Sequence, residues 1–138
     1  MSHLLEVKGL TTVFAGDYGK NITVDHIDFH VDEGEVVCIV GESGCGKSVT
    51  SLSIMGLLGR GGAVIDGSVF FDDRNLLSMN EKELDKIRGD QLTMIFQDPL
   101  SSLNPLQKIG RQIEEALVYH TDLDKKQRQE RVLELLNQ

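Results

Sequence analysis

The chain has 138 residues, of which 40% are hydrophobic and 26% charged, an ordinary composition for a folded domain or part of a larger one. Fourteen lysines and arginines against 22 aspartates and glutamates give a net charge of −8. This acidic balance argues against sequence-independent binding to nucleic acid, which needs basic surface to neutralise phosphates. No run of about 18 apolar residues occurs, so no segment is predicted to span a membrane.

The opening residues MSHLLEVKGL lack the basic start and long apolar stretch of a secretory signal, so we expect the chain to stay inside the cell. The two cysteines, Cys38 and Cys45, lack metal-ligand spacing and are predicted to be free thiols in a reducing compartment. The four histidines are scattered. His26 and His30 can share one face of a strand, but the sequence offers no evident third ligand, so we predict that the histidines are solvated or packed rather than metal ligands.

The first third of the chain predicts a β-layer. Residues 4–8 form a short strand candidate, and residues 15–21 are rich in turn formers. Residues 26–32 read HIDFHVD, in which apolar and polar residues alternate, as in an antiparallel strand with one buried face. After a turn at residues 33–34, residues 36–40 read VVCIV. Such a continuous apolar run is typical of a parallel strand that is covered on both faces.

A helix and a hairpin are predicted next. The helix runs from residue 47 to 58 and ends near three glycines. Residues 64–72 are predicted to form a hairpin that turns at Asp66 and Gly67.

The remaining elements are mostly helical. Ser78 and Glu81 have the spacing of a capping box and predict the start of a short helix. Residues 91–96 form a second apolar strand candidate. Apolar residues at helical spacing then predict helices over 109–117 and 132–136.

A glycine-rich loop lies between the 36–40 strand candidate and the helix. Residues 41–48 read GESGCGKS and fit the pattern G-x-x-x-x-G-K-S/T. Its three glycines allow backbone conformations in which the loop amides surround a phosphate. Lys47 is predicted to reach the β- and γ-phosphate oxygens, and the Ser48 hydroxyl to ligate Mg²⁺. The predicted nucleotide-binding residues are Gly41, Glu42, Ser43, Gly44, Cys45, Gly46, Lys47, Ser48 and Val49.

The segments GESGCGKSVTSLSIMGLL and MIFQDPLSSLNP closely resemble the ATP-binding subunits of ABC transporters, within them the oligopeptide/dipeptide importer branch. The likeness extends over essentially the whole chain. It implies an α/β fold: a P-loop NTPase core with an N-terminal antiparallel β-layer and the start of an α-helical subdomain. The resemblance and the change of composition place the division at residues 1–97, the β-layer and core portion, and 98–138, the Q-loop and partial helical subdomain.

The resemblance also assigns residues beyond the loop. Gln97 matches the Q-loop glutamine and is expected to approach Mg²⁺ and the attacking water. The expected catalytic residues are therefore Gln97 and Lys47. The expected metal ligands are Ser48 and Gln97. The family stacks an aromatic ring on the adenine, and Phe14 is the best-placed match, with Tyr18 as the alternative. Such stacking contributes about 1–3 kcal/mol in nucleic-acid binders. Residues 98–105 are expected to receive the coupling helix of a permease.

Three motifs of the family, an LSGGQ-like signature, a Walker B Asp-Glu strand and a switch histidine, do not occur in these 138 residues. We therefore interpret the chain as the N-terminal portion of an incomplete ABC ATPase domain. The parent protein is expected to hydrolyse ATP, and this portion alone is not.

By resemblance, the parent is the energy-coupling subunit of a peptide uptake transporter on the inner face of the cell membrane. Its cofactors are ATP and Mg²⁺, and its partners are permease subunits and a second ABC ATPase subunit. An alternative is a non-catalytic nucleotide-binding module, in which ATP binding itself is the signal. A third interpretation is a small GTPase or a nucleotide kinase. The missing Asn/Thr-Lys-x-Asp base-recognition sequence and the position of the loop behind a β-layer argue against it.

Overall fold

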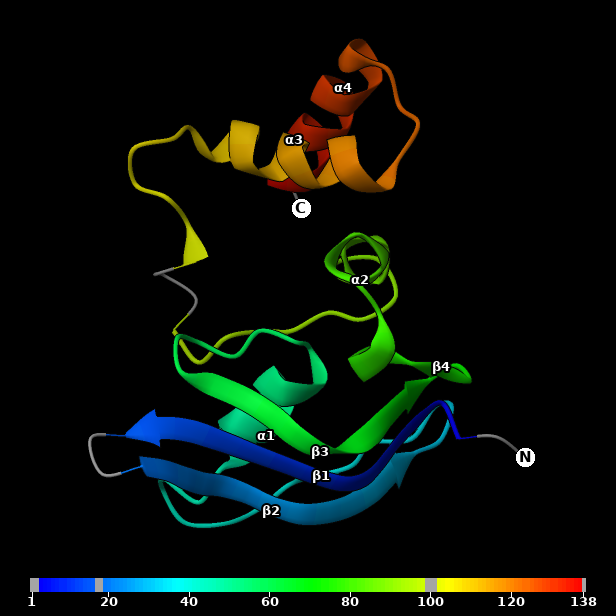
Figure 1. Cartoon of the computed structure of the whole chain (residues 1–138). Helices are drawn as coiled ribbons and strands as arrows, with labels where there is room; N and C mark the ends of the chain where they lie inside the picture. Colours follow the sequence, from blue (N-terminus) through cyan, green and yellow to red (C-terminus); the bar gives the residue numbers. More distant parts are fainter. Residues whose placement is uncertain (1–2, 17–18, 99–101, 138) are drawn as a thin grey trace. The chain divides into compact units, whose positions relative to one another are not determined.

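The computed structural model describes residues 3–16, 19–98 and 102–137 (Figure 1). The chain divides into two compact units, Met1–Asn80 and Glu81–Gln138, and each is described by itself. The predicted division at residue 97 follows the subdomains of the family and stays a prediction.

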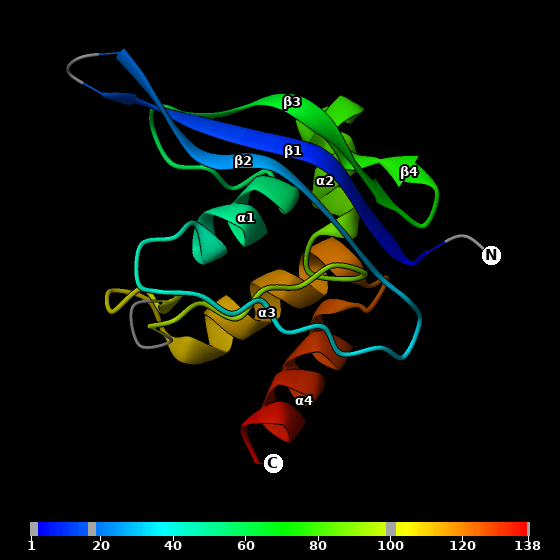
Figure 2. The same cartoon turned by 90° about the horizontal axis from the view of Figure 1, so that it is seen from below.

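The first unit is an antiparallel sheet with a helix on one face. Its strands have the order β2-β1-β3-β4, so β1 and β3 are the inner strands. Helix α1 contacts β1, β2 and β3, and Figure 2 shows it lying against one face of the sheet. The elements are β1 (Leu5–Gly16), β2 (Gly19–Val31), α1 (Lys47–Ile54), β3 (Gly62–Phe71), β4 (Arg74–Asn75) and the 3₁₀ helix η1 (Leu76–Ser78).

The core of this unit lies between β1, β3 and α1. Leu10 of β1 and Val69 of β3 are fully buried. The buried hydroxyl of Thr12 is 2.8 Å from that of Ser53 in α1, and the Ser53 hydroxyl donates to the carbonyl of Val49 (2.7 Å). Because the single hydroxyl hydrogen of Ser53 is used in this way, Thr12 donates to Ser53. This bond satisfies two buried polar groups and ties α1 to the sheet.

The β1–β2 hairpin confirms the predicted β-layer. The strand expected over residues 4–8 is the beginning of the longer β1, and the turn-rich stretch lies where β1 ends and β2 begins. In β2, Ile27 and Phe29 are half-buried, whereas Asp28 and His30 are exposed, as the alternation predicts. Helix α1 ends at Ile54, four residues before the predicted end.

Two predicted strands are wrong. Residues 36–40 form a loop, in which Val36 and Val40 are each 88% exposed. Residues 91–96 also form a loop apart from an isolated bridge between Arg88 and Leu92. A strand is defined by hydrogen bonds to a neighbouring strand, and among the described residues neither segment belongs to one of the sheet's strands. An apolar, β-branched composition favours pairing but cannot supply the partner.

The predicted hairpin over residues 64–72 is also wrong, because β3 is one strand that pairs with β1. Asp66 and Gly67 lie inside it, beside a register shift in β1 between Lys8 and Thr11. Gly67 has φ +100°, and a Cβ there would lie 2.7 Å from the carbonyl carbon of Gly9. The glycine therefore permits a close approach of two backbones at a bulge, the other common reason for glycine in a strand.

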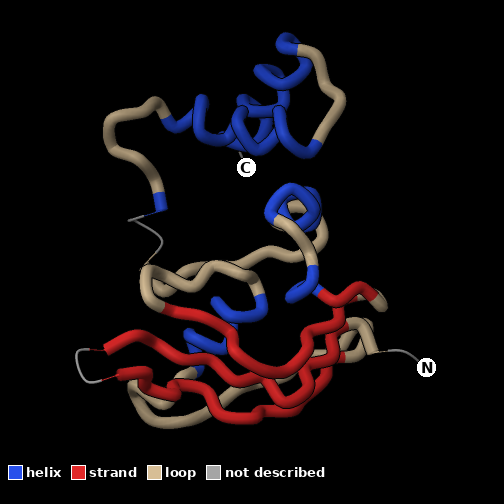
Figure 3. The backbone as a smooth tube through the Cα atoms, in the orientation of Figure 1, coloured by secondary structure: helices blue, strands red, loops and turns tan. Residues whose placement is uncertain are grey.

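The second unit contains α2 (Glu81–Ile87), α3 (Ile109–His120) and α4 (Lys125–Leu136). Figure 3 shows α3 and α4 joined by a loop. Helices α3 and α4 contact each other and confirm the two helices predicted from apolar spacing. None of the helices in the described ranges combines the length and the apolar character needed to cross a bilayer.

The helix starts in this part of the chain differ from the prediction. Ser78 ends η1 in the first unit, where its hydroxyl donates to the carbonyl of Asn75 (2.8 Å), so the capping box predicted at Ser78 is wrong. A capping box is instead present at α4. The Asp124 carboxylate accepts from the amide of Gln127 (2.9 Å), and the Gln127 side chain accepts from the amide of Asp124 (2.9 Å).

Candidate functional site

The glycine-rich loop leads directly into α1. Its last glycine, Gly46, is the N-cap of the helix, with φ +95°, and Gly44 has φ +83°. Gly46 is buried, and a Cβ there would lie 2.8 Å from the carbonyl oxygen of Thr23 in β2. A side chain at position 46 would therefore meet both backbone strain and a rigid neighbour. This explains why the loop needs glycine where it passes β2.

Lys47 is the first residue of α1, and its side chain turns back over the loop. Its Nζ donates to the carbonyl oxygens of Gly41 (2.7 Å) and Glu42 (2.6 Å) and lies 3.5 Å from the Sγ of Cys45. The ammonium is therefore held at the loop rather than extended into water. The Lys47 ammonium therefore places a positive charge at the loop.

The start of α1 is suited to an anion. Within the described chain no side chain caps its first amides, and its first turn carries no acidic residue. The first N–H groups of any helix have no partner inside the helix, and the helix dipole adds positive potential there. Together with Lys47, this end of α1 has the chemistry that binds phosphate. Ser48, the second residue of the helix, is exposed, whereas Val49 is half-buried.

A hollow of about 430 Å³ adjoins the loop. It is bounded by β2, by residues 37–40 and by side chains of the loop and α1, among them Cys45, Lys47 and Thr50. Lys47 therefore contacts the loop and also lines this hollow.

The predicted site residues outside the loop and α1 are Phe14, Tyr18 and Gln97. Phe14 of β1 is half-buried, and its ring covers Gly62, since a Cβ on Gly62 would lie 2.8 Å from the Phe14 Cε1. Tyr18 lies outside the described residues. Gln97 is exposed and belongs to the second unit. The roles of Phe14, Tyr18 and Gln97 therefore stay predictions.

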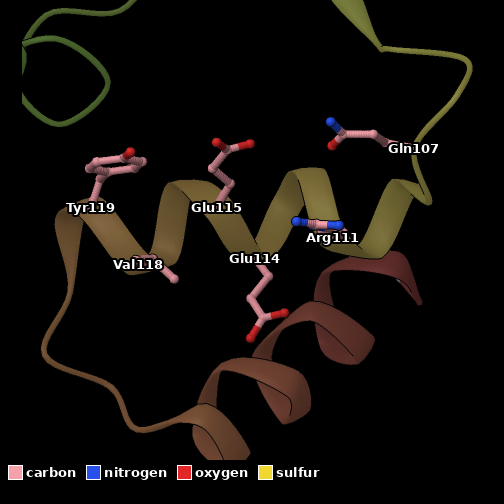
Figure 4. A pocket seen from close by; sticks show the side chains of 6 residues that line it. All are labelled: Gln107, Arg111, Glu114, Glu115, Val118 and Tyr119. Atoms are coloured by element: carbon pink, nitrogen blue, oxygen red, sulfur yellow. The ribbon is translucent and has the colours of Figure 1, made fainter.

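A second hollow, of about 380 Å³, lies along α3. In Figure 4, Tyr119 and Glu115 point to one side of the helix, whereas Glu114 points toward α4. Glu114 is 3.6 Å from the Nε of Arg128, an ion pair between the two helices. None of the predicted site residues lines this hollow, so it is not the candidate site.

The sequence analysis missed a cluster of His3, His30 and Asp32. The Nδ1 of His3 is 2.6 Å from the Oδ1 of Asp32, and the rings of His3 and His30 are stacked with centroids 3.8 Å apart. The hydrogen bond from His3 lowers the pKa of Asp32 below its usual value. Only a predicted pairing of the first strand with the end of residues 26–32 would have revealed this cluster.

A glycine-rich loop that ends in a lysine at the start of a helix, behind an antiparallel β-layer, is the arrangement of a P-loop protein. Residues 24–138 match the family model described as ABC transporter, and the chain belongs to this family. The chain is 50% identical over 137 residues to the oligopeptide transport ATP-binding protein AppD of Bacillus subtilis (strain 168), covering 99% of this chain and 42% of that protein. It is 42% identical over 134 residues to the oligopeptide transport ATP-binding protein OppD of Escherichia coli (strain K12), covering 97% of this chain and 40% of that protein.

A solved structure supports the same assignment. The dimeric ATP-binding cassette MJ0796, bound to ADP and Pi, matches with a TM-score of 0.80 and 27% identity, over 96% of this chain and 56% of that chain. The predicted fold class, a portion of a P-loop NTPase core with a β-layer and the start of a helical subdomain, is confirmed. The chain spans about two-fifths of the length of the peptide-transport relatives.

Proposed function

We propose that this chain is the ATP-binding part of an ABC-type peptide importer, whose whole protein couples ATP binding and hydrolysis to transport. The observation that carries this proposal is the loop, in which the Lys47 ammonium lies over the carbonyls of Gly41 and Glu42 at an uncapped helix start. The names of the relatives AppD and OppD support peptide as the transported class.

The residues present fit a nucleotide triphosphate. The loop amides and the first turn of α1 donate to phosphate oxygens, and Lys47 adds charge-assisted hydrogen bonds. We assign Ser48 and Gln97 as ligands of Mg²⁺, which neutralises phosphate charge when bound. Gln97 would also orient water in the whole protein. We assign Phe14 as the residue whose ring stacks on the adenine, with Tyr18 as the alternative.

The partners of the whole protein are also proposals. A second ABC ATPase subunit is supported by the dimeric state of the cassette MJ0796. We propose that permease subunits hold the protein at the inner face of the cell membrane. Residues 98–105, part of which lies outside the described residues, would receive the permease.

The metal assignment is tested with Ser48→Ala. We expect Mg²⁺ to tighten ATP binding to the natural chain, and this tightening to shrink by at least about tenfold in the variant, because a charge-assisted contact is worth about 1.5–3 kcal/mol. Calorimetric titration with ATP, with and without Mg²⁺, measures the difference. Ser51→Ala, one turn later on α1, is the matched control and should behave as the natural chain. Equal Mg²⁺ dependence in Ser48→Ala and the natural chain would remove Ser48 from the site.

Cys45 provides a chemical probe of the loop. It is exposed, and its thiol is 3.5 Å from the Lys47 ammonium. We expect iodoacetamide to modify Cys45, and MgATP at about ten times its Kd to slow the reaction about tenfold, since about nine-tenths of the sites are then occupied. Mass spectrometry of the Cys45 peptide measures the rate. AMP, which lacks the β- and γ-phosphates, is the control and should protect much less; equal rates with and without ATP would contradict the proposal.

A further inference from the structure

The strand register of the β-layer brings three metal-ligating side chains together. His30 of β2 is paired with Glu6 of β1, and Asp32 lies just beyond the end of β2, two residues after His30. His3 would point to the face opposite His30 if the chain continued straight from β1. A bend at Leu4 turns it back over His30 and Asp32.

The three side chains already lie close to coordination distance. One ligand atom from each, an imidazole nitrogen of His3 and His30 and a carboxylate oxygen of Asp32, lies within 4.8 Å of the other two. Ligand atoms placed about 2.1 Å from a tetrahedral zinc ion are about 3.4 Å apart. Rotation of exposed side chains closes this difference without movement of the strands. The His3 side chain is 33% exposed and that of Asp32 57% exposed, so an ion can enter from solvent.

We propose that His3, His30 and Asp32 bind one divalent transition-metal ion of the zinc type, which joins the start of β1 to the end of β2. Two imidazoles and one carboxylate form a ligand set that suits Zn²⁺ and its neighbours, whereas Mg²⁺ prefers oxygen ligands alone. Water completes the coordination. Coordination through the Nδ1 of His3 would displace its hydrogen bond to Asp32, because a coordinating nitrogen must be deprotonated.

The surroundings of the cluster favour a cation. Glu6, opposite His30, adds a second carboxylate near the imidazoles, and its own ion pair is with Lys8, with 2.8 Å between the Oε2 and the Nζ. An ordinary surface ion pair of His3 with Asp32 would not need a second imidazole stacked at 3.8 Å. Because His3 precedes β1 and Asp32 follows β2, a bound ion would hold the start of β1 and the end of β2 together. It would therefore stabilise the folded chain by binding to it in preference to the unfolded chain.

The proposal is tested by titrating the 138-residue chain with Zn²⁺, in a background of Cys38→Ser and Cys45→Ser that removes the thiols as ligands. We expect one Zn²⁺ per chain, a rise in the thermal midpoint on binding, and no competition from excess Mg²⁺. Co²⁺ should give the visible absorption of a bound ion and be displaced by Zn²⁺. Circular dichroism confirms that each variant is folded.

His30→Gln and Asp32→Asn should each weaken Zn²⁺ binding at least about tenfold, since even the loss of an outer-shell partner weakens metal sites about 10–100-fold. His120→Gln removes a histidine from α3 and is the matched control, with Zn²⁺ binding unchanged. Wild-type Zn²⁺ affinity in either cluster variant, or a loss of binding in His120→Gln as large as in His30→Gln, would overturn the proposal. Absence of Zn²⁺ binding to the parent background would also overturn it.

Discussion

Replacing Lys47 by alanine should weaken ATP binding to this chain about tenfold to a hundredfold. One hydrogen bond to a charged group is worth about 1.5–3 kcal/mol, and about 1.4 kcal/mol of binding free energy corresponds to a factor of ten in affinity. The Lys47 ammonium already lies over the loop, 2.7 Å from the carbonyl oxygen of Gly41 and 2.6 Å from that of Glu42. An anion at the loop meets this charge without a large movement of the side chain. Calorimetric titration with MgATP measures the change.

Two further variants make this experiment specific. Lys20→Ala removes an exposed lysine from β2 and should leave ATP binding unchanged. Lys47→Arg keeps the charge but replaces a compact ammonium by a planar guanidinium, so we expect it to restore only part of the affinity. The stability of Lys47→Ala should change little, because the released carbonyls can bond to water. An unchanged ATP affinity in this folded variant would contradict the phosphate-binding role of the loop.

Replacing Gly67 by alanine should lower the free energy of unfolding by about 2–4 kcal/mol, the range of severe single substitutions. Two causes add. Gly67 has φ +100°, a region that side chains rarely adopt, and its Cβ would lie 2.7 Å from the carbonyl carbon and oxygen of Gly9 and from the Cα of Leu10. These atoms are all backbone within paired strands, so no flexible side chain can move aside. Urea denaturation followed by circular dichroism measures the loss.

Gly34→Ala separates the two causes. Gly34 also has positive φ, +74°, but a Cβ there meets no atom within 4 Å among the described residues. Gly34→Ala should therefore lower the free energy of unfolding only by the cost of backbone strain, about 1 kcal/mol. Equal losses in Gly67→Ala and Gly34→Ala would show that the approach of β3 to β1 is not as close as the structure has it.

The parts of the prediction that succeeded depend on short segments of sequence. The loop over residues 41–48 leads into a helix as expected, because its glycines, Lys47 and Ser48 act through neighbours a few residues away. The alternation in β2 and the apolar spacing of α3 and α4 are likewise local patterns with one physical period each.

The parts that failed depend on partners far along the chain. Residues 36–40 have the composition of a buried strand, yet they form a loop, since no described strand pairs with them. Asp66 and Gly67 have the composition of a turn, yet they lie inside β3, because pairing with β1 extends past them. Local composition gives a segment a preference for strand or turn, and the segment adopts that conformation only where a hydrogen-bond partner is available.

The amino-acid sequence by itself determined the family, the glycine-rich loop that leads into α1 and the helices of the second unit, because each is a local pattern of residue types and spacings. Only the tertiary structure decided the contacts of Gly46 and Gly67 with distant backbone, the path of β3, and the meeting of His3 with His30 and Asp32. The physical reason is register. Which residues face one another across paired strands depends on how two distant segments align, and a shift of one residue moves a side chain to the other face.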